Sequence, residues 1–137
     1  MSSPLIYVSI KCEVGQVFDS KYKTAVFDAM RKTIGEIMKK NASFFTMDKS
    51  QASNPEQCEL SIKVSVTKDD KSKPPKLVAA VVVTGMKFSS GVSKTLAATG
   101  HAQFEGPNPN KLDKDAAQVT SDAVESLMTS KVVPAMK

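Results

Sequence analysis

Hydrophobic and polar residues alternate along three stretches of the chain. Residues 5–14, 60–67 and 95–104 each place apolar side chains at one parity and mostly polar ones at the other. This pattern is typical of half-buried strands. Residues 77–88 are almost continuously apolar and β-branched, which predicts a strand that is central or covered. Residues 44–47 predict a further short strand.

Two other stretches repeat their apolar residues at helical spacing. The first begins at a cap, Asp19 or Ser20, and runs to about Lys40. The second runs from about Asp113 to Lys131, and Pro134 is predicted to end it. Each helix is expected to bury one face. The predicted buried stripes are Tyr22, Val26, Ala29, Met30, Thr33, Ile34 and Ile37, and then Ala116, Ala117, Thr120, Ala123, Val124, Leu127 and Met128.

The segments between these elements read as turns. Residues 48–57 are polar and predict a loop, and the charged run 68–76 predicts the turn of a long antiparallel hairpin. Gly85 suggests a bulge or bend within its strand. The last strand has small residues at its inward positions, which would let a helix approach the sheet closely.

The predicted order is β-α-(β)-β-β-β-α, and residues 1–137 are expected to form a single domain. We expect an α+β two-layer sandwich with a mixed or mainly antiparallel sheet of four to five strands. Both helices should cover one face of that sheet, because each has one apolar stripe to bury.

The residue inventory disfavours several kinds of chemistry. One His and two Cys cannot supply a tetrahedral zinc site of the usual S/N kind. No phosphate-binding glycine motif occurs, and no apolar run reaches the roughly 20 residues of a membrane span. His101 lies at an outward parity and reads as a surface residue. We therefore expect no enzyme activity, no cofactor and no metal.

The net charge is +5, from 19 Lys and Arg against 14 Asp and Glu, and lysine dominates. Two interpretations of this charge stay open: a solvated surface, or a site for nucleic acid or an anionic surface. A single Arg and few aromatics disfavour nucleic acid. If such a site exists, the predicted residues are Lys71, Lys73 and Lys76, together with lysines of the first predicted helix.

The two cysteines leave the compartment open. Cys12 and Cys58 fall at inward strand positions. They could be two reduced thiols, or they could form a disulfide, and a disulfide would indicate an oxidising compartment. The chain shows no secretory signal. The expected location is therefore cytoplasmic, or periplasmic and envelope-associated if a signal peptide was removed.

The order of elements resembles the small periplasmic α/β domain shared by the TolB N-terminal domain, the lipoprotein activators of penicillin-binding proteins and the curli-secretion lipoprotein. The stretches that carry the resemblance are the opening strand 6–10, the segment 43–49 after the first helix and the strand 58–66. The closing pair of long strands and the Ala-rich helix complete it. The resemblance implies a non-catalytic module that docks on protein partners, sometimes in oligomeric rings.

Two aromatic residues are the predicted anchors of such a contact. Tyr7 lies at the outer parity of the first strand, and Phe45 lies on a short strand that could be an edge. Ordinary packing is the alternative for both. An open strand edge could also pair with a second copy of the chain and give a homo-oligomer.

Overall fold

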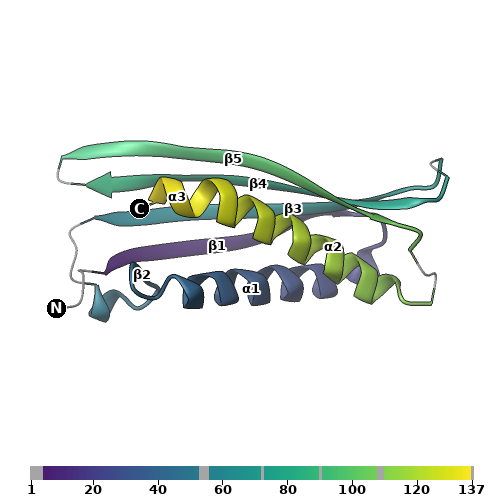
Figure 1. Ribbon diagram of the computed structural model, residues 1–137, viewed down its shortest axis with the longest axis horizontal. Coiled ribbons are helices and arrows are strands. Elements are labelled where there is room, and N and C mark those ends of the chain that lie inside the picture. The colour runs from purple at the N-terminus through teal and green to yellow at the C-terminus, as the bar shows by residue number, and fades with distance from the viewer. Residues whose placement is uncertain (1–4, 53–55, 72, 90, 108–109, 137) are drawn as a thin grey trace.

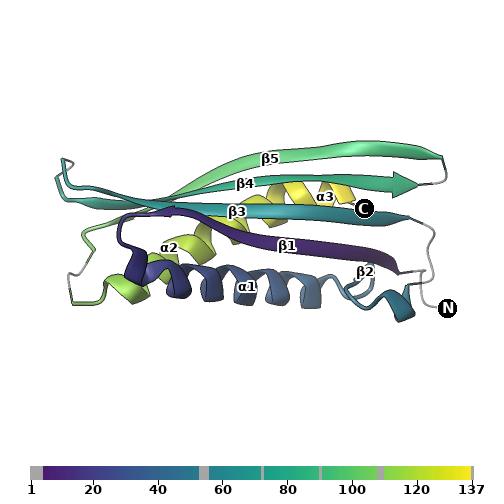
Figure 2. The same cartoon turned by 180° about the vertical axis from the view of Figure 1, so that it is seen from behind.

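The sheet forms one layer of the molecule and the helices form the other (Figure 1). The computed structural model describes residues 5–52, 56–71, 73–89, 91–107 and 110–136. Both long helices lie on the same face of the sheet, and no described element covers the opposite face (Figures 1 and 2). The predicted two-layer α+β sandwich is therefore confirmed.

Five strands form the sheet in the order β2-β1-β3-β4-β5. Strand β1 pairs in parallel with both β2 and β3, whereas β3, β4 and β5 are antiparallel neighbours. The crossover from β1 through the first helix produces the parallel pairing, and the two hairpins produce the rest. The strand bounds are β1 Ile6–Val17, β2 Phe45–Thr46, β3 Gln57–Asp69, β4 Lys76–Ser89 and β5 Val92–Glu105.

The first helix, α1 (Lys23–Lys40), follows a short 3-10 turn, η1 (Ser20–Tyr22). The Asp19 carboxylate accepts a hydrogen bond from the Lys21 backbone N–H, so the predicted cap is present. A second 3-10 turn, η2 (Lys49–Gln51), lies in the loop after β2. The second long helix, α2 (Leu112–Leu127), packs on β4 and β5, while α1 packs on α2 and β1.

The core lies between the sheet and the helix layer. The buried faces of β3 and β4 meet the apolar stripes of both helices, as their spacing predicts. Gly100 of β5 lets α2 approach closely, because a Cβ at that position would lie 3.2 Å from Leu127 Cβ. Between the helices, Thr33 Oγ1 donates to the Ala29 carbonyl and lies 2.9 Å from Ser121 Oγ, so the buried hydroxyl is satisfied.

Two local predictions are wrong. Pro134 does not end the helix: α2 continues through a π-helical turn, η3 (Met128–Val132), into α3 (Val133–Met136). A π turn changes the hydrogen-bond spacing, and Pro134 is the second residue of α3, in a first turn where a missing N–H is tolerated. Gly85 marks no bulge, since β4 keeps its register there. The irregularity lies instead in β1, between Val14 and Val17.

Strand β4 is central, as its apolar run predicts, but its outer face is not covered. Its inner residues are buried beneath the helices, whereas Val82 on the outer face is 43% exposed. An antiparallel sheet tolerates one solvated face when enough polar residues share it. Here the neighbours of Val82 across the strands are Lys63 and Thr99.

Candidate binding surfaces

The two cysteines are free thiols, and the disulfide alternative is wrong. Cys58 lies opposite Val8 on the neighbouring strand, whereas Cys12 lies opposite Ile62. The two positions are offset by four residues along parallel strands, or about 13 Å, and a disulfide needs Cα atoms within about 7 Å. Burial raises the pKa of both thiols, with Arg31 opposing it at Cys12 and Lys87 opposing it at Cys58.

The side chain of His101 is exposed on the outer face of β5. Its cross-strand partner is Ala80, and its neighbours on the same face of β5 are Thr99 and Gln103. None of these three is an acid that could orient an imidazole for general base catalysis. Within the described residues, no cluster of three or more His, Cys, Asp or Glu side chains could hold a metal ion.

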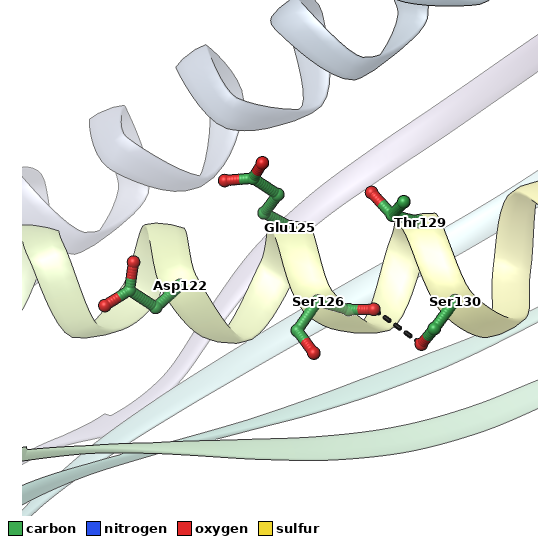
Figure 3. Close-up of a pocket in the computed structure, with 5 residues that line it drawn as sticks. All are labelled: Asp122, Glu125, Ser126, Thr129 and Ser130. Carbon is green, nitrogen blue, oxygen red and sulfur yellow. Dashed lines mark hydrogen bonds between the residues drawn. The ribbon is translucent and has the colours of Figure 1, made fainter.

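The helix layer carries two open depressions. Figure 3 shows the first, of about 420 Å³, along α2 and η3, where the Ser130 hydroxyl donates to the Ser126 carbonyl at 2.6 Å. Five residues from one helical segment line it, so it has no opposite wall to enclose a ligand: Asp122, Glu125, Ser126, Thr129 and Ser130. The second lies between α1 and α2 at their N-terminal halves, and small residues such as Ala25 and Ala117 are among those that line it. Pockets that hold small molecules are normally more enclosed and more apolar.

The predicted lysine cluster lies at the tip of the β3–β4 hairpin, where acidic residues are interleaved with it. Lys68 Nζ lies 3.4 Å from Asp70, and Lys76 lies opposite Asp69 on one side and Glu105 on the other. The Asp69 carboxylate accepts a hydrogen bond from the Lys71 backbone N–H at 3.0 Å. Lys71 and Lys73 are exposed. The structure thus brings the lysines together but partly neutralises them, which weakens the prediction of a nucleic-acid site.

The two predicted aromatic anchors differ in accessibility. Phe45 is only 3% exposed and belongs to the core, so it is not available to a partner, and its prediction as an anchor is wrong. Strand β2 is an edge strand, as predicted, but its phenylalanine points inward. Tyr7 is half-buried on the outer face and pairs with Thr46 and Gln57. Its role in binding stays a prediction.

The two edges of the sheet are unequal. At one edge, β2 pairs with only the first two residues of β1, and α1 contacts β1. At the other edge, β5 presents 14 residues, and within the described residues no further strand pairs with it. Between Lys94 and Glu105 this edge carries no Lys, Arg, Asp, Glu or Pro. Natural sheets usually protect long edges with charges, prolines or bulges.

The comparisons with known proteins add little. No family model matches the chain, and no curated protein matches it. Among solved structures the chain is similar to a minor lipoprotein from Acinetobacter baumannii, with 14% identity, a TM-score of 0.41 and coverage of 90% of this chain and 86% of that one. It is also similar to the PelC dodecamer from Paraburkholderia phytofirmans, with 15% identity, a TM-score of 0.37 and coverage of 91% and 93%. At these scores neither similarity carries an inference about function.

Proposed function

We propose that the chain is a non-catalytic assembly module of a bacterial cell envelope, and that it assembles by pairing the β5 edge with the β5 edge of a second copy. The observation that carries this proposal is the 14-residue edge of β5, which lacks the devices that normally block pairing. The envelope assignment rests on the sequence resemblance to small periplasmic domains.

The distribution of charge along β5 favours an antiparallel pair of copies. Lys94 lies near one end of the strand and Glu105 at the other. A two-fold axis perpendicular to the sheet and near Thr99 would bring the end of β5 that carries Lys94 in one copy beside the end that carries Glu105 in the other, with the two side chains on opposite faces of the sheet. Parallel strands in register would place like charges together, which is unfavourable. The two-fold arrangement is also the usual symmetry of soluble dimers.

The inner face of β5 gives a second reason. Its inward residues beyond Leu96 are half-buried, whereas those of the neighbouring β4 from Leu77 to Val83 are buried. In the two-fold arrangement the helix layers of both copies lie on the same side of one continuous ten-stranded sheet. The second copy would therefore cover apolar surface as well as pair the edge. The half-buried residues are Ala98, Gly100, Ala102 and Phe104.

The test uses two double variants that carry the same added charge on the same face. Ala97→Lys with Thr99→Lys places four lysines near the two-fold axis of the dimer. Thr84→Lys with Val82→Lys places them on β4, directly across from those positions but away from the edge. All four side chains are exposed, so the fold should tolerate both changes. The measurement is molar mass by light scattering over a concentration series.

We expect the original chain and the β4 variant to approach twice the monomer mass at high concentration, and the β5 variant to remain monomeric. A monomeric original chain at every concentration would refute the proposal. Equal loss of the dimer in both variants would also refute it, because it would point to net charge or to the open face rather than to the edge.

A further inference from the structure

The exposed large apolar side chains are not spread evenly over the molecule. Among the described residues five are exposed, and four of them lie at one end of the sheet: Phe44 at 43%, Met47 at 50%, Phe88 at 37% and Val92 at 66%. The fifth, Val82, lies midway along β4. The opposite end, with the charged hairpin, has none of these five.

The topology explains how residues from distant parts of the sequence reach this end. The Ile6 N–H donates to the Phe44 carbonyl, which ties the segment before β2 to the start of β1. Strand β3 begins beside β1 at Gln57, and Gln57 lies opposite Phe88 near the end of β4. The β4–β5 turn follows at once, with Ser89 opposite Val92. Figures 1 and 2 both place β2 and this turn at the same end.

We call Phe44, Met47, Phe88 and Val92 the apolar end. These residues lie on two separate segments, the β2 segment and the β4–β5 turn. The strands that carry them are spread over up to four strand spacings, or about 19 Å. More polar positions separate the two segments, such as Gln57 between Tyr7 and Phe88. Exposed apolar side chains gathered at one place mark a site that contacts a protein or a membrane, and the charges that border this end distinguish between the two.

Lysines surround the apolar end. Lys39 and Lys40 finish α1 next to the β2 segment, Lys49 follows Met47 in η2, and Lys94 follows Val92 in β5. All four are exposed. Three acidic residues lie among them: Glu56, whose carboxylate is 3.5 Å from Lys87 Nζ, Asp48, and the exposed Glu59 of β3. The hydroxyl and backbone N–H of Ser50 hold the pKa of Asp48 below its ordinary value, so it stays ionised, and the lysines still outnumber the carboxylates.

We infer that the apolar end docks on the surface of an anionic lipid bilayer. Exposed phenylalanine, methionine and valine side chains would enter the region between headgroups and acyl chains, and the four lysines would meet the anionic headgroups. This combination of an apolar surface with a basic border is the one that binds peripheral proteins to membranes. Docking there leaves the β5 edge free along most of its length, so the inference does not depend on the proposed assembly.

The test is sedimentation of the 137-residue chain with vesicles of phosphatidylcholine containing about 30% phosphatidylglycerol, and with vesicles of phosphatidylcholine alone. Two variants probe the charge. One variant removes three charges at the apolar end by changing Lys40, Lys49 and Lys94 to Gln. The other removes three charges at the opposite end by changing Lys71, Lys73 and Lys76 to Gln. Two further variants probe the apolar part: Phe88→Ser with Val92→Ser, and Val82→Ser as its exposed control.

We expect the original chain to sediment with the anionic vesicles and poorly with the neutral ones, and added salt to weaken the binding. The three Gln changes at the apolar end should lower the partition coefficient on the order of 100-fold, since each lysine near an anionic surface contributes roughly fivefold. The double Ser variant should lower it at least about tenfold. Both control variants should bind within about twofold of the original.

Three results would overturn the inference. The first is no sedimentation with anionic vesicles at low salt. The second is equal loss in the variants of the two ends, which would indicate a response to net charge alone. The third is absence of vesicle binding together with a dimer that the double Ser variant abolishes, which would show that a second copy covers the apolar end. Circular dichroism of each variant, unchanged from the original, verifies that the fold is intact.

Discussion

The two hairpins of the sheet share strand β4 but end in opposite ways. At one end, β3 and β4 meet in a turn where lysines and aspartates alternate, with Lys68 and Asp70 paired at 3.4 Å. At the other end, β4 and β5 meet in a tight turn, where Ser89 lies opposite Val92 and apolar side chains flank the connection. One strand therefore links a solvated tip to an apolar one.

The difference separates two uses of surface residues. Interleaved charges at the β3–β4 tip keep that hairpin in water and cancel much of each other's field, so the cluster of lysines there carries little information about a partner. Exposed apolar side chains at the β4–β5 tip gain nothing in water. The lysines that point to a binding surface are those that border apolar residues. They are not the lysines that cluster in the charged run 68–76.

The largest expected effect on the free energy of unfolding comes from a substitution at the close contact between β4 and β3, next to the apolar tip. A Cβ at Gly85 would overlap the backbone carbonyl oxygen of Glu59 and crowd the Leu60 side chain. We expect Gly85→Ala to lower the free energy of unfolding by about 3 kcal/mol, because backbone atoms cannot move aside as a side chain can. Chemical denaturation followed by circular dichroism measures the change.

The matched control is Gly35→Ala on the exposed side of α1, where an added Cβ meets nothing within 4 Å. We expect this change to stabilise the protein by about 0.5 to 1 kcal/mol, as is usual for a glycine inside a helix. Equal effects at the two glycines would show that β4 does not approach β3 as closely as the structure has it. The apolar tip would then be less firmly held than the charged one.

Most of the fold could be predicted from periodicity. The alternating strands and the two helical stripes have the expected faces, because burial of one side dictates both patterns. The continuation of the helix through Pro134 could not be predicted, since it depends on a π turn that no residue pattern marks. The open outer face of β4 was also out of reach, because a continuous apolar run does not reveal whether anything covers it.

The candidate sites are located by the pairing register of the strands more than by the hydrophobic pattern of the sequence. The sequence shows an apolar residue at Phe88 and another at Met47, but only the pairing of β1, β2, β3 and β4 brings them to one end. The same pairing separates Cys12 from Cys58, which share an inward parity. A signal for the β5 edge was present in the sequence, as ten residues without Lys, Arg, Asp, Glu or Pro, although the strand order was needed to show that they form an edge.

We expect a difference of moderate size between the reaction rates of the two thiols, and this difference shows whether the apolar end opens. Cys58 is fully buried in the first rows of β3, near that end, whereas Cys12 is half-buried farther along β1. We expect iodoacetamide to modify Cys12 slowly and Cys58 more slowly still in the native protein, because a thiol must be both accessible and ionised to react. Mass spectrometry after timed quenching measures both rates. Faster modification of Cys58 than of Cys12 would mean that the apolar end is frayed.

The raised pKa of both thiols also predicts a dependence of stability on pH. In the unfolded chain the thiols ionise near their ordinary pKa, whereas in the folded protein they stay protonated to higher pH. The unfolded state then binds fewer protons, so the free energy of unfolding falls as pH rises above about 8.5 to 9. The variant Cys58→Ala should show a shallower fall, whatever its absolute stability. An unchanged slope would assign the effect to other groups.

The smallest expected effect is at the charged tip. We expect Lys71, Lys73 and Lys76 changed together to Glu to alter the free energy of unfolding by no more than about 0.5 kcal/mol per residue, because Lys71 and Lys73 are exposed and Lys76 is half-buried at the strand start. A gel-shift series with DNA and RNA at low salt tests the same variant for binding. If the tip is only solvated, the original chain causes no shift; a shift that the variant abolishes would make the charged tip a nucleic-acid site and reverse the contrast between the two hairpins.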